Sequence, residues 1–69
     1  MRSVTGRDLA RAVEKKGWVL LRVHGSHHIY GREGSTARLS VPVHEGRDLK
    51  LGLLRHLMKV ADLNEDDLR

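Results

Sequence analysis

The 69-residue sequence has no cysteine and no phenylalanine, and it contains a single proline, a single tryptophan and a single tyrosine. The absence of cysteine excludes disulfides, thiolate metal sites and cysteine nucleophiles, and it is typical of a protein from a reducing cytoplasm. The longest uninterrupted apolar run covers residues 18–21, whereas a membrane-spanning helix needs about 20 residues. Charged side chains interrupt the first turns after Met1, so we expect no secretory signal. We therefore expect a soluble, cytoplasmic protein.

The length and composition favour one small folded domain that covers residues 1–69. A chain of this size buries only about 60% of the surface that it exposes when unfolded, so two layers of secondary structure are the realistic limit. Hydrophobic residues make up 39% of the sequence and charged residues make up 32%. This balance is typical of a folded domain and excludes a disordered tail.

Positive charge is concentrated in the first 61 residues. The chain has 13 lysines and arginines against nine aspartates and glutamates, which gives a formal net charge of +4. Residues 62–69 contain four acids and one base, or −3, so residues 1–61 contain twelve bases and five acids, or +7. Such an excess attracts polyanions, and nucleic acid is the leading partner. An acidic protein that covers the same face, or a basic surface that only maintains solubility, are the alternatives.

The N-terminal segment predicts a helix at residues 5–16. Thr5 and Asp8 have the spacing of a capping box, and apolar residues follow at helical spacing. Gly17 supplies the residue that adopts the left-handed conformation at the end of such a helix.

Three short segments rich in β-branched and apolar residues predict strands at residues 18–23, 27–30 and 36–41. A glycine–serine pair separates the first two, and a loop with two glycines separates the next two. Short connections of this kind produce an antiparallel meander. Pro42 has no N–H to donate, so it belongs at a strand end or a sheet edge.

A second amphipathic helix is predicted from residue 51 or 52 to residue 61. Asn64 and the three acids after it indicate the N-cap of a short last helix. The resulting order is α-β-β-β-α. We expect an α+β fold in which two helices cover one face of a three-stranded antiparallel sheet and the other face stays open to solvent or to a ligand.

Four of the five histidines lie close together in the sequence or near its turns: His24, His27, His28 and His44. A metal site is one interpretation, but adjacent strand residues point to opposite faces and no cysteine completes a tetrahedral set, so we expect neither a metal nor another cofactor. General acid–base catalysis is the second interpretation, because an imidazole exchanges protons near neutral pH. Ordinary half-exposed strand histidines are the third.

RNA suits such a histidine because its 2′-OH is a built-in nucleophile. A base that removes the hydroxyl proton lets the oxygen attack the adjacent phosphorus, while cationic side chains stabilise charge on the phosphorane oxygens. Neither a protein nucleophile nor a metal is required. Gly25 and Ser26 would let the backbone approach a phosphate and would add a hydroxyl donor.

Five short motifs occur in order along the chain: Gly17-Trp18, Gly25-Ser26-His27-His28, Val41-Pro42-Val43-His44, Leu51-Gly52-Leu53-Leu54-Arg55 and Lys59-Val60-Ala61-Asp62-Leu63. This ordered set resembles the HicA family, which comprises small toxins of bacterial and archaeal toxin–antitoxin modules. The resemblance covers nearly the whole chain. It implies a fold similar to the double-stranded RNA-binding domain. It also implies an mRNA-cleaving endoribonuclease that a HicB-type antitoxin holds inactive.

The resemblance implies that the histidine ending the family's Gly-Ser/Gly-His motif is catalytic, and His27 occupies that position. His28 stays as the alternative, because it is also a histidine and stands one position away. One histidine does not easily serve as both base and acid, and His28, His44, Tyr30, a lysine or water are the open choices for the second group. The chain has Asp62 where many relatives have glycine, which affects only the expected helix stop.

The basic side chains and the glycine–serine turn are the expected contacts to RNA. We expect binding by some of these residues: Gly25, Ser26, Lys15, Lys16, Arg22, Arg32, Arg38, Arg55 and Lys59. Trp18 could stack on a base, but its position after a helix stop favours the core. The alternative functions are a non-catalytic RNA-binding module of the same fold and a DNA-binding accessory protein. RNA sequence preference and oligomeric state do not follow from the sequence.

Overall fold

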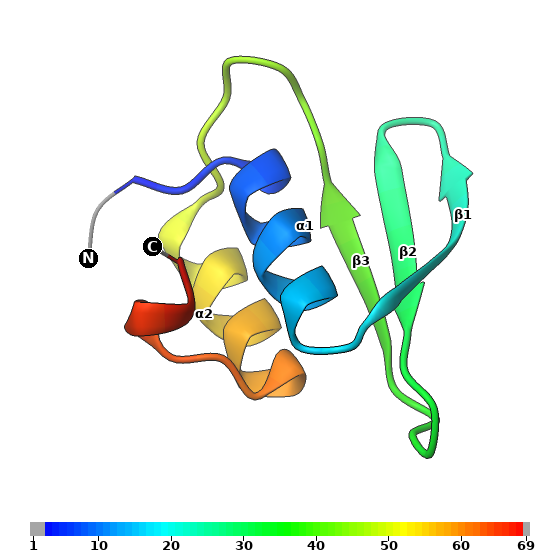
Figure 1. The fold of residues 1–69 in the computed structure, drawn as a ribbon. Helices are drawn as coiled ribbons and strands as arrows, with labels where there is room; N and C mark the ends of the chain where they lie inside the picture. The colour runs from blue at the N-terminus through cyan, green and yellow to red at the C-terminus, as the bar shows by residue number, and fades with distance from the viewer. Residues whose placement is uncertain (1–2, 69) are drawn as a thin grey trace.

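The computed structural model describes residues 3–68 as two layers, a three-stranded sheet and a pair of α-helices on one of its faces (Figure 1). In chain order the elements are α1 (Gly6–Lys15), β1 (Val19–His24), β2 (His27–Gly31), β3 (Arg38–Pro42), α2 (Leu51–Ala61) and the 3-10 helix η1 (Glu65–Leu68). The predicted α-β-β-β-α order is confirmed, and the fold is consistent with that of the double-stranded RNA-binding domain. None of the helices in the described range is long and apolar enough to cross a membrane.

The N-terminus of α1 has the capping box that the sequence predicts. The Asp8 backbone N–H donates to the Thr5 hydroxyl at 3.1 Å, and the Thr5 backbone N–H donates to the Asp8 carboxylate at 3.3 Å. Gly6 packs so closely against the end of β3 that a Cβ there would collide with the carbonyl oxygen of Pro42. Glycine at this position therefore allows the first turn of α1 to lie against the sheet.

β1 begins at Val19 and not at the predicted Trp18, because the Trp18 N–H belongs to the end of α1. This N–H donates to the carbonyl oxygen of Val13 at 3.1 Å, and Gly17 between them has a φ of 93°. The bond is typical of a helix that ends in a left-handed glycine. β1 ends at His24, one residue beyond the predicted end.

β3 begins at Arg38, two residues after the predicted start. The Ala37 N–H donates to the Ser35 hydroxyl at 3.1 Å, so the segment before Arg38 makes a local turn bond and not a ladder bond with β2. The C-terminal limits of β2 and β3 each lie one residue beyond the prediction, at Gly31 and Pro42.

β2 is the central strand, with β1 and β3 antiparallel on either side of it. β1 contains one extra residue in its pairing with β2. Leu20 pairs with Tyr30 and Arg22 pairs with the adjacent Ile29, so Leu21 forms a β-bulge. Because side chains alternate between the two faces of a strand, the bulge determines which face the rest of β1 presents.

The core lies between the helices and one face of the sheet. Tyr30 of β2 and Leu39 and Val41 of β3 point toward it, and Leu9 of α1 and Leu54 of α2 pack over them, each with 1% or less of its surface exposed. Among the residues that the structure describes, no helix lies over the other face of the sheet (Figure 1). We call it the open face.

The C-terminal part of the chain closes the fold with a left-handed residue and one short turn. α2 is followed by Asp62, which has φ 59° and ψ 44°. The predicted last helix is the 3-10 helix η1. Its N-terminus is capped reciprocally, because the Asn64 N–H donates to the Asp67 carboxylate at 2.8 Å and the Asp67 N–H donates to the Asn64 side-chain oxygen at 3.2 Å. Leu68 of η1 is buried against the core.

Candidate functional site

The three strands carry positive charge and no acidic residue. Their basic residues are Arg22 and Arg38, their histidines are His24, His27 and His28, and all nine acids of the chain lie outside them. A sheet without carboxylates favours anions, because no negative charge within it opposes them. The faces on which these five side chains lie then decide where an anion would bind.

His27 begins β2 and lies on the open face. It pairs with His24 of β1 and with Pro42 of β3, and it is exposed. Its Nδ1 atom lies 3.0 Å from the Oγ atom of Ser40, which alternates along β3 with buried, core-facing residues. The hydroxyl holds the ring in one orientation. Within residues 3–68 no hydrogen bond is made by Nε2, so His27 presents this ring nitrogen to solvent.

The bulge at Leu21 places Arg22 and His24 on the open face beside His27. Each of the two pairs with a β2 residue of that face, and directly opposed residues of an antiparallel pair point to the same side. If Leu21 were paired regularly and did not bulge, strict alternation would place both on the side of Leu20, which faces the helices. The bulge therefore adds a guanidinium and an imidazole to the surface around His27.

A cavity of about 500 Å³ lies on the open face and reaches Ser40. Its lining residues are Leu21, Arg22, Ile29, Arg38, Leu39 and Ser40. The guanidinium of Arg38 is held in place, because its Nη1 donates to the carbonyl oxygen of Ala37 at 3.0 Å. Two guanidinium groups beside aliphatic side chains suit a nucleotide, which combines a charged phosphate with a flat base.

The two-residue turn between β1 and β2 brings His44 to this end of the sheet. Gly25 has a φ of 63°, which is the left-handed value required at the first position of such a turn. The carbonyl oxygen of Ser26 accepts a hydrogen bond from the Val43 N–H at 2.8 Å, and its hydroxyl oxygen lies 3.3 Å from the Nε2 atom of His44. His44 therefore contacts the residue that precedes His27.

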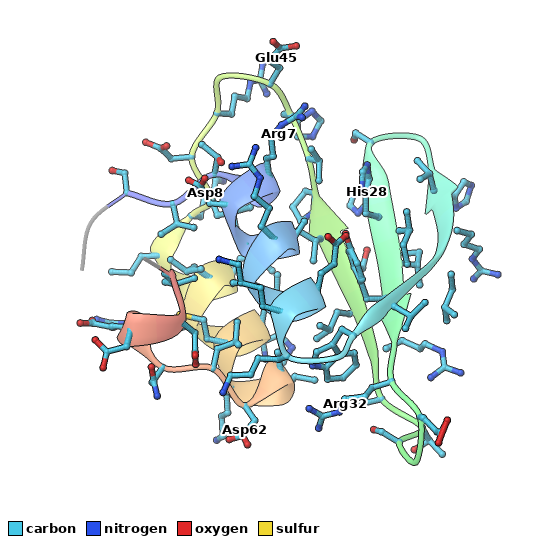
Figure 2. All side chains as sticks on the ribbon, in the orientation of Figure 1. Arg7, Asp8, His28, Arg32, Glu45 and Asp62 are labelled. Atoms are coloured by element: carbon cyan, nitrogen blue, oxygen red, sulfur yellow. The ribbon has the colours of Figure 1, made fainter. Side chains whose placement is uncertain are left out.

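His28 lies on the opposite face from His27. It is half-buried, and it pairs with Val41, which faces the core. Figure 2 shows the His28 ring on the side of β2 where α1 lies. There it lines a cleft of about 490 Å³ whose charged residues are Arg7, Arg11, Glu14 and Glu45. The structure thus gives the two adjacent histidines entirely different surroundings.

Tyr30 lies in the core and not beside His27. Only 1% of its surface is exposed, and its hydroxyl donates to the carboxylate of Glu14 on α1 at 2.7 Å. Burial raises the pKa of the Tyr30 phenol, and the hydrogen bond to Glu14 and the charge of that carboxylate raise it further. The structure therefore does not bring Tyr30 together with the open-face residues.

Four of the predicted RNA-binding cations belong to the helical layer. Lys15 is the exposed last residue of α1, and the Nζ atom of Lys16 lies 3.5 Å from a carboxylate oxygen of Asp67. Arg55 and Lys59 are exposed on α2, which packs against the other side of the sheet. The open face receives only Arg22 and Arg38 of the seven predicted cations.

Arg32 lies in the β2–β3 connection and stacks on Trp18. Its guanidinium carbon is 4.7 Å from the centre of the indole ring, within the range of a cation–π contact. Trp18 itself is 2% exposed, so the prediction that it belongs to the core is confirmed. Its Nε1 atom is buried without a hydrogen-bond partner within the described part of the chain.

Ser40, Leu21 and Ile29 are open-face residues that the sequence-based assignment of RNA contacts omitted. The signal for Ser40 is present in the sequence, since it alternates with Leu39 and Val41 and so lies on the opposite side from them. No pattern in the sequence marks Leu21, because a bulge depends on the pairing with β2.

The chain matches a family model described as the HicA toxin of bacterial toxin–antitoxin, over residues 6–63. The match covers both α-helices and all three strands. No protein with a curated description matches the chain.

Proposed function

The chain belongs to the HicA family of bacterial toxins, and from this we propose that it is an endoribonuclease that cleaves mRNA on the open face of its sheet. HicA toxins are mRNA interferases. The observation that carries the proposal is the position of His27. It is exposed on a sheet without acidic residues. Its Nδ1 atom contacts Ser40, and its Nε2 atom faces solvent beside a cavity lined by two arginines.

His27 acts as the general base in this proposal. With its hydrogen on Nδ1, the neutral ring donates to the Ser40 hydroxyl, and Nε2 keeps the lone pair. Nε2 takes the proton from a ribose 2′-OH, and the oxygen attacks the adjacent phosphorus. The bond from phosphorus to the 5′ oxygen breaks, which leaves a 2′,3′-cyclic phosphate and, after protonation, a 5′-hydroxyl. Such base catalysis contributes typically about 10²- to 10⁴-fold.

His44 is the group that we propose as the proton donor to the leaving oxygen. It contacts Ser26, which adjoins His27. Of the other groups considered for this role, His28 and Tyr30 lie on the opposite face of the sheet. The geometry therefore favours His44 over both of them.

Arg22 and Arg38 bind the phosphate in this proposal. Both line the open-face cavity, and a guanidinium pairs with two phosphate oxygens at once. As charge builds on the phosphorane oxygens, such fixed cations stabilise the transition state more than the ground state. The aliphatic side chains of Leu21 and Ile29 offer a surface for the neighbouring base.

A HicB-type antitoxin is the proposed protein partner, and it acts by covering the open face. Occlusion of His27 predicts that the antitoxin abolishes RNA binding and RNA cleavage together. An antitoxin that binds the chain while cleavage continues would contradict inhibition by occlusion.

The test is cleavage of a labelled single-stranded RNA in EDTA by the wild-type chain and by the His27→Ala variant. We expect the wild type to cleave the RNA. The cleavage rate of the variant should be at least about 100-fold lower, because the variant lacks the general base. Binding of the same RNA should persist, because the phosphate-binding arginines remain. Gel separation of the products measures cleavage, and fluorescence anisotropy measures binding.

His28→Gln is the matched control, because it replaces the neighbouring histidine on the other face and keeps a polar side chain in the half-buried position. We expect this variant to retain cleavage. Wild-type cleavage by His27→Ala, or loss of cleavage in His28→Gln alone, would refute the assignment of His27 as the general base. Binding without cleavage by the wild type would leave the alternative of a non-catalytic RNA-binding module.

A further inference from the structure

β1 is an edge strand with apolar side chains exposed on both of its faces. All six of its residues are exposed, and Val19, Leu20, Leu21 and Val23 keep 42–59% of their surface accessible. Leu20 and Val23 pair with the helix-facing Tyr30 and His28, whereas Val19 and Leu21 lie on the open-face side, next to Gly31. Neither side of β1 is buried, so packing into the core does not explain why the strand is rich in apolar side chains.

The helices leave β1 without cover. Among the described residues, α1 and α2 pack chiefly against β3, at the other edge of the sheet. Within residues 3–68, β1 pairs only with β2, so the backbone N–H and C=O groups along its outer edge have no ladder partner in that range. Proteins commonly protect such an edge with proline, charged side chains, a bulge or a covering segment. β1 has the bulge at Leu21 and the charged Arg22, but among residues 3–68 it has no proline, lysine or covering segment.

The charge around β1 specifies which partner fits the edge. The sheet has no acidic residue, and Arg22 and His24 lie on the open-face side of β1. On the helix side, the cleft beside Leu20 has two arginines and two glutamates, so the excess positive charge is on the open-face side. A strand with alternating apolar and acidic side chains would complement this edge. A second copy of β1 would instead bring two Arg22 side chains close together with no carboxylate from either strand.

We propose that β1 is the docking edge for the protein antitoxin, which adds a fourth strand with apolar and acidic side chains to the sheet. The inference rests on the proposed function in that it takes the antitoxin as the partner. A strand added there lies next to Arg22 and His24, one strand away from His27. The body of the antitoxin attached to it then reaches the open face.

The test compares binding of the antitoxin from the same toxin–antitoxin module to Val19→Lys, Val23→Lys and Leu51→Lys variants by calorimetry. Both valines are on β1 and line neither cavity. Leu51 is a similarly exposed apolar residue on α2 and serves as the matched control. We expect each β1 variant to weaken binding by about tenfold or more, because a lysine on a pairing edge opposes strand addition.

RNA cleavage by the free β1 variants should equal that of the wild type, and the His27→Ala variant should still bind the antitoxin. These two measurements separate the docking edge from the ribonuclease activity, since failure of cleavage in the wild type would not alter antitoxin binding. Hydrogen exchange provides a second readout, and we expect the β1 amides to become protected in the complex.

Equal antitoxin binding by all three lysine variants would overturn the proposal, as would β1 amides that exchange at the same rate with and without the antitoxin. A free chain that is a dimer, and that Val23→Lys converts to a monomer, would assign the edge to a second copy of the chain. That result would also overturn the proposal.

Discussion

At the residue scale, the hydroxyl of Ser40 orients the ring of His27. Ser40 lies 3.0 Å from Nδ1, and it belongs to β3, two positions from the ladder partner of His27. Ser40 in β3 thus positions His27 at the start of the neighbouring strand, β2. The Ser40 hydroxyl contacts His27 and not the RNA, so its loss should lower the cleavage rate and leave RNA binding unchanged.

Ser40→Ala should lower kcat by roughly two- to tenfold with little change in KM. This range corresponds to the loss of one hydrogen bond, which contributes about 0.5–1.5 kcal/mol. Ser40→Thr keeps a hydroxyl at the same position and should restore most of the rate. Single-turnover cleavage of a labelled RNA measures both variants. An unchanged rate for Ser40→Ala, or no rescue by threonine, would show that the hydroxyl does not position His27.

At the element scale, the end of α2 carries the least favourable backbone conformation in the described chain. Asp62 is the one non-glycine residue between 3 and 68 with a positive φ, 59°, and it lies at the end of α2 (Figure 2). A Cβ disfavours this conformation, and glycine adopts it freely. Its negative charge also lies at the C-terminus of α2, where the helix dipole opposes it.

Asp62→Gly should stabilise the protein by about 0.5–1 kcal/mol, because it relieves both of these costs. Urea unfolding followed by circular dichroism measures the change. Asp62→Ala is the control, since it removes the carboxylate but keeps the Cβ. We expect less stability for alanine than for glycine. Equal stability of the two variants would show that the left-handed conformation carries no penalty here.

The elements differ in how far the sequence predicts them. Local signals were sufficient for the capping box of α1, the glycine–serine hairpin and the N-cap at Asn64. The start of β1 was misplaced, because Trp18 completes the end of α1 through a backbone bond that side-chain propensity does not reveal. Long-range pairing escaped prediction, because the bulge at Leu21 and the contact between His27 and Ser40 both depend on which strands lie together.

At the scale of the whole molecule, the two layers differ in their negative charge. All acids lie outside the strands, and three of them lie in η1, which packs near α1. Lys16 of the helical layer pairs with one of these acids, Asp67. The open face has Arg22 and Arg38 and no acid among the strands, so a polyanion that binds there meets no opposing charge from the sheet.

Arg22→Gln and Arg38→Gln should each weaken binding of single-stranded RNA and reduce the slope of log K against log salt by about 0.7, the value for one phosphate contact. Arg55→Gln on α2 is the matched control, and it should leave the slope unchanged because it lies on the other layer. Titrations at several salt concentrations measure the slopes. A larger effect for Arg55 than for Arg22 would place the RNA on the helical layer.

The bulge at Leu21 has a consequence for the gene that encodes this chain. A deletion of that one codon would shorten the strand by a single residue and leave every other amino acid in place. Arg22 would then follow Leu20 directly, and the pairs Arg22–Ile29 and His24–His27 would form a regular ladder that keeps both side chains on the open face. Loss of this codon would therefore remove the bulge and keep the cationic surface beside His27.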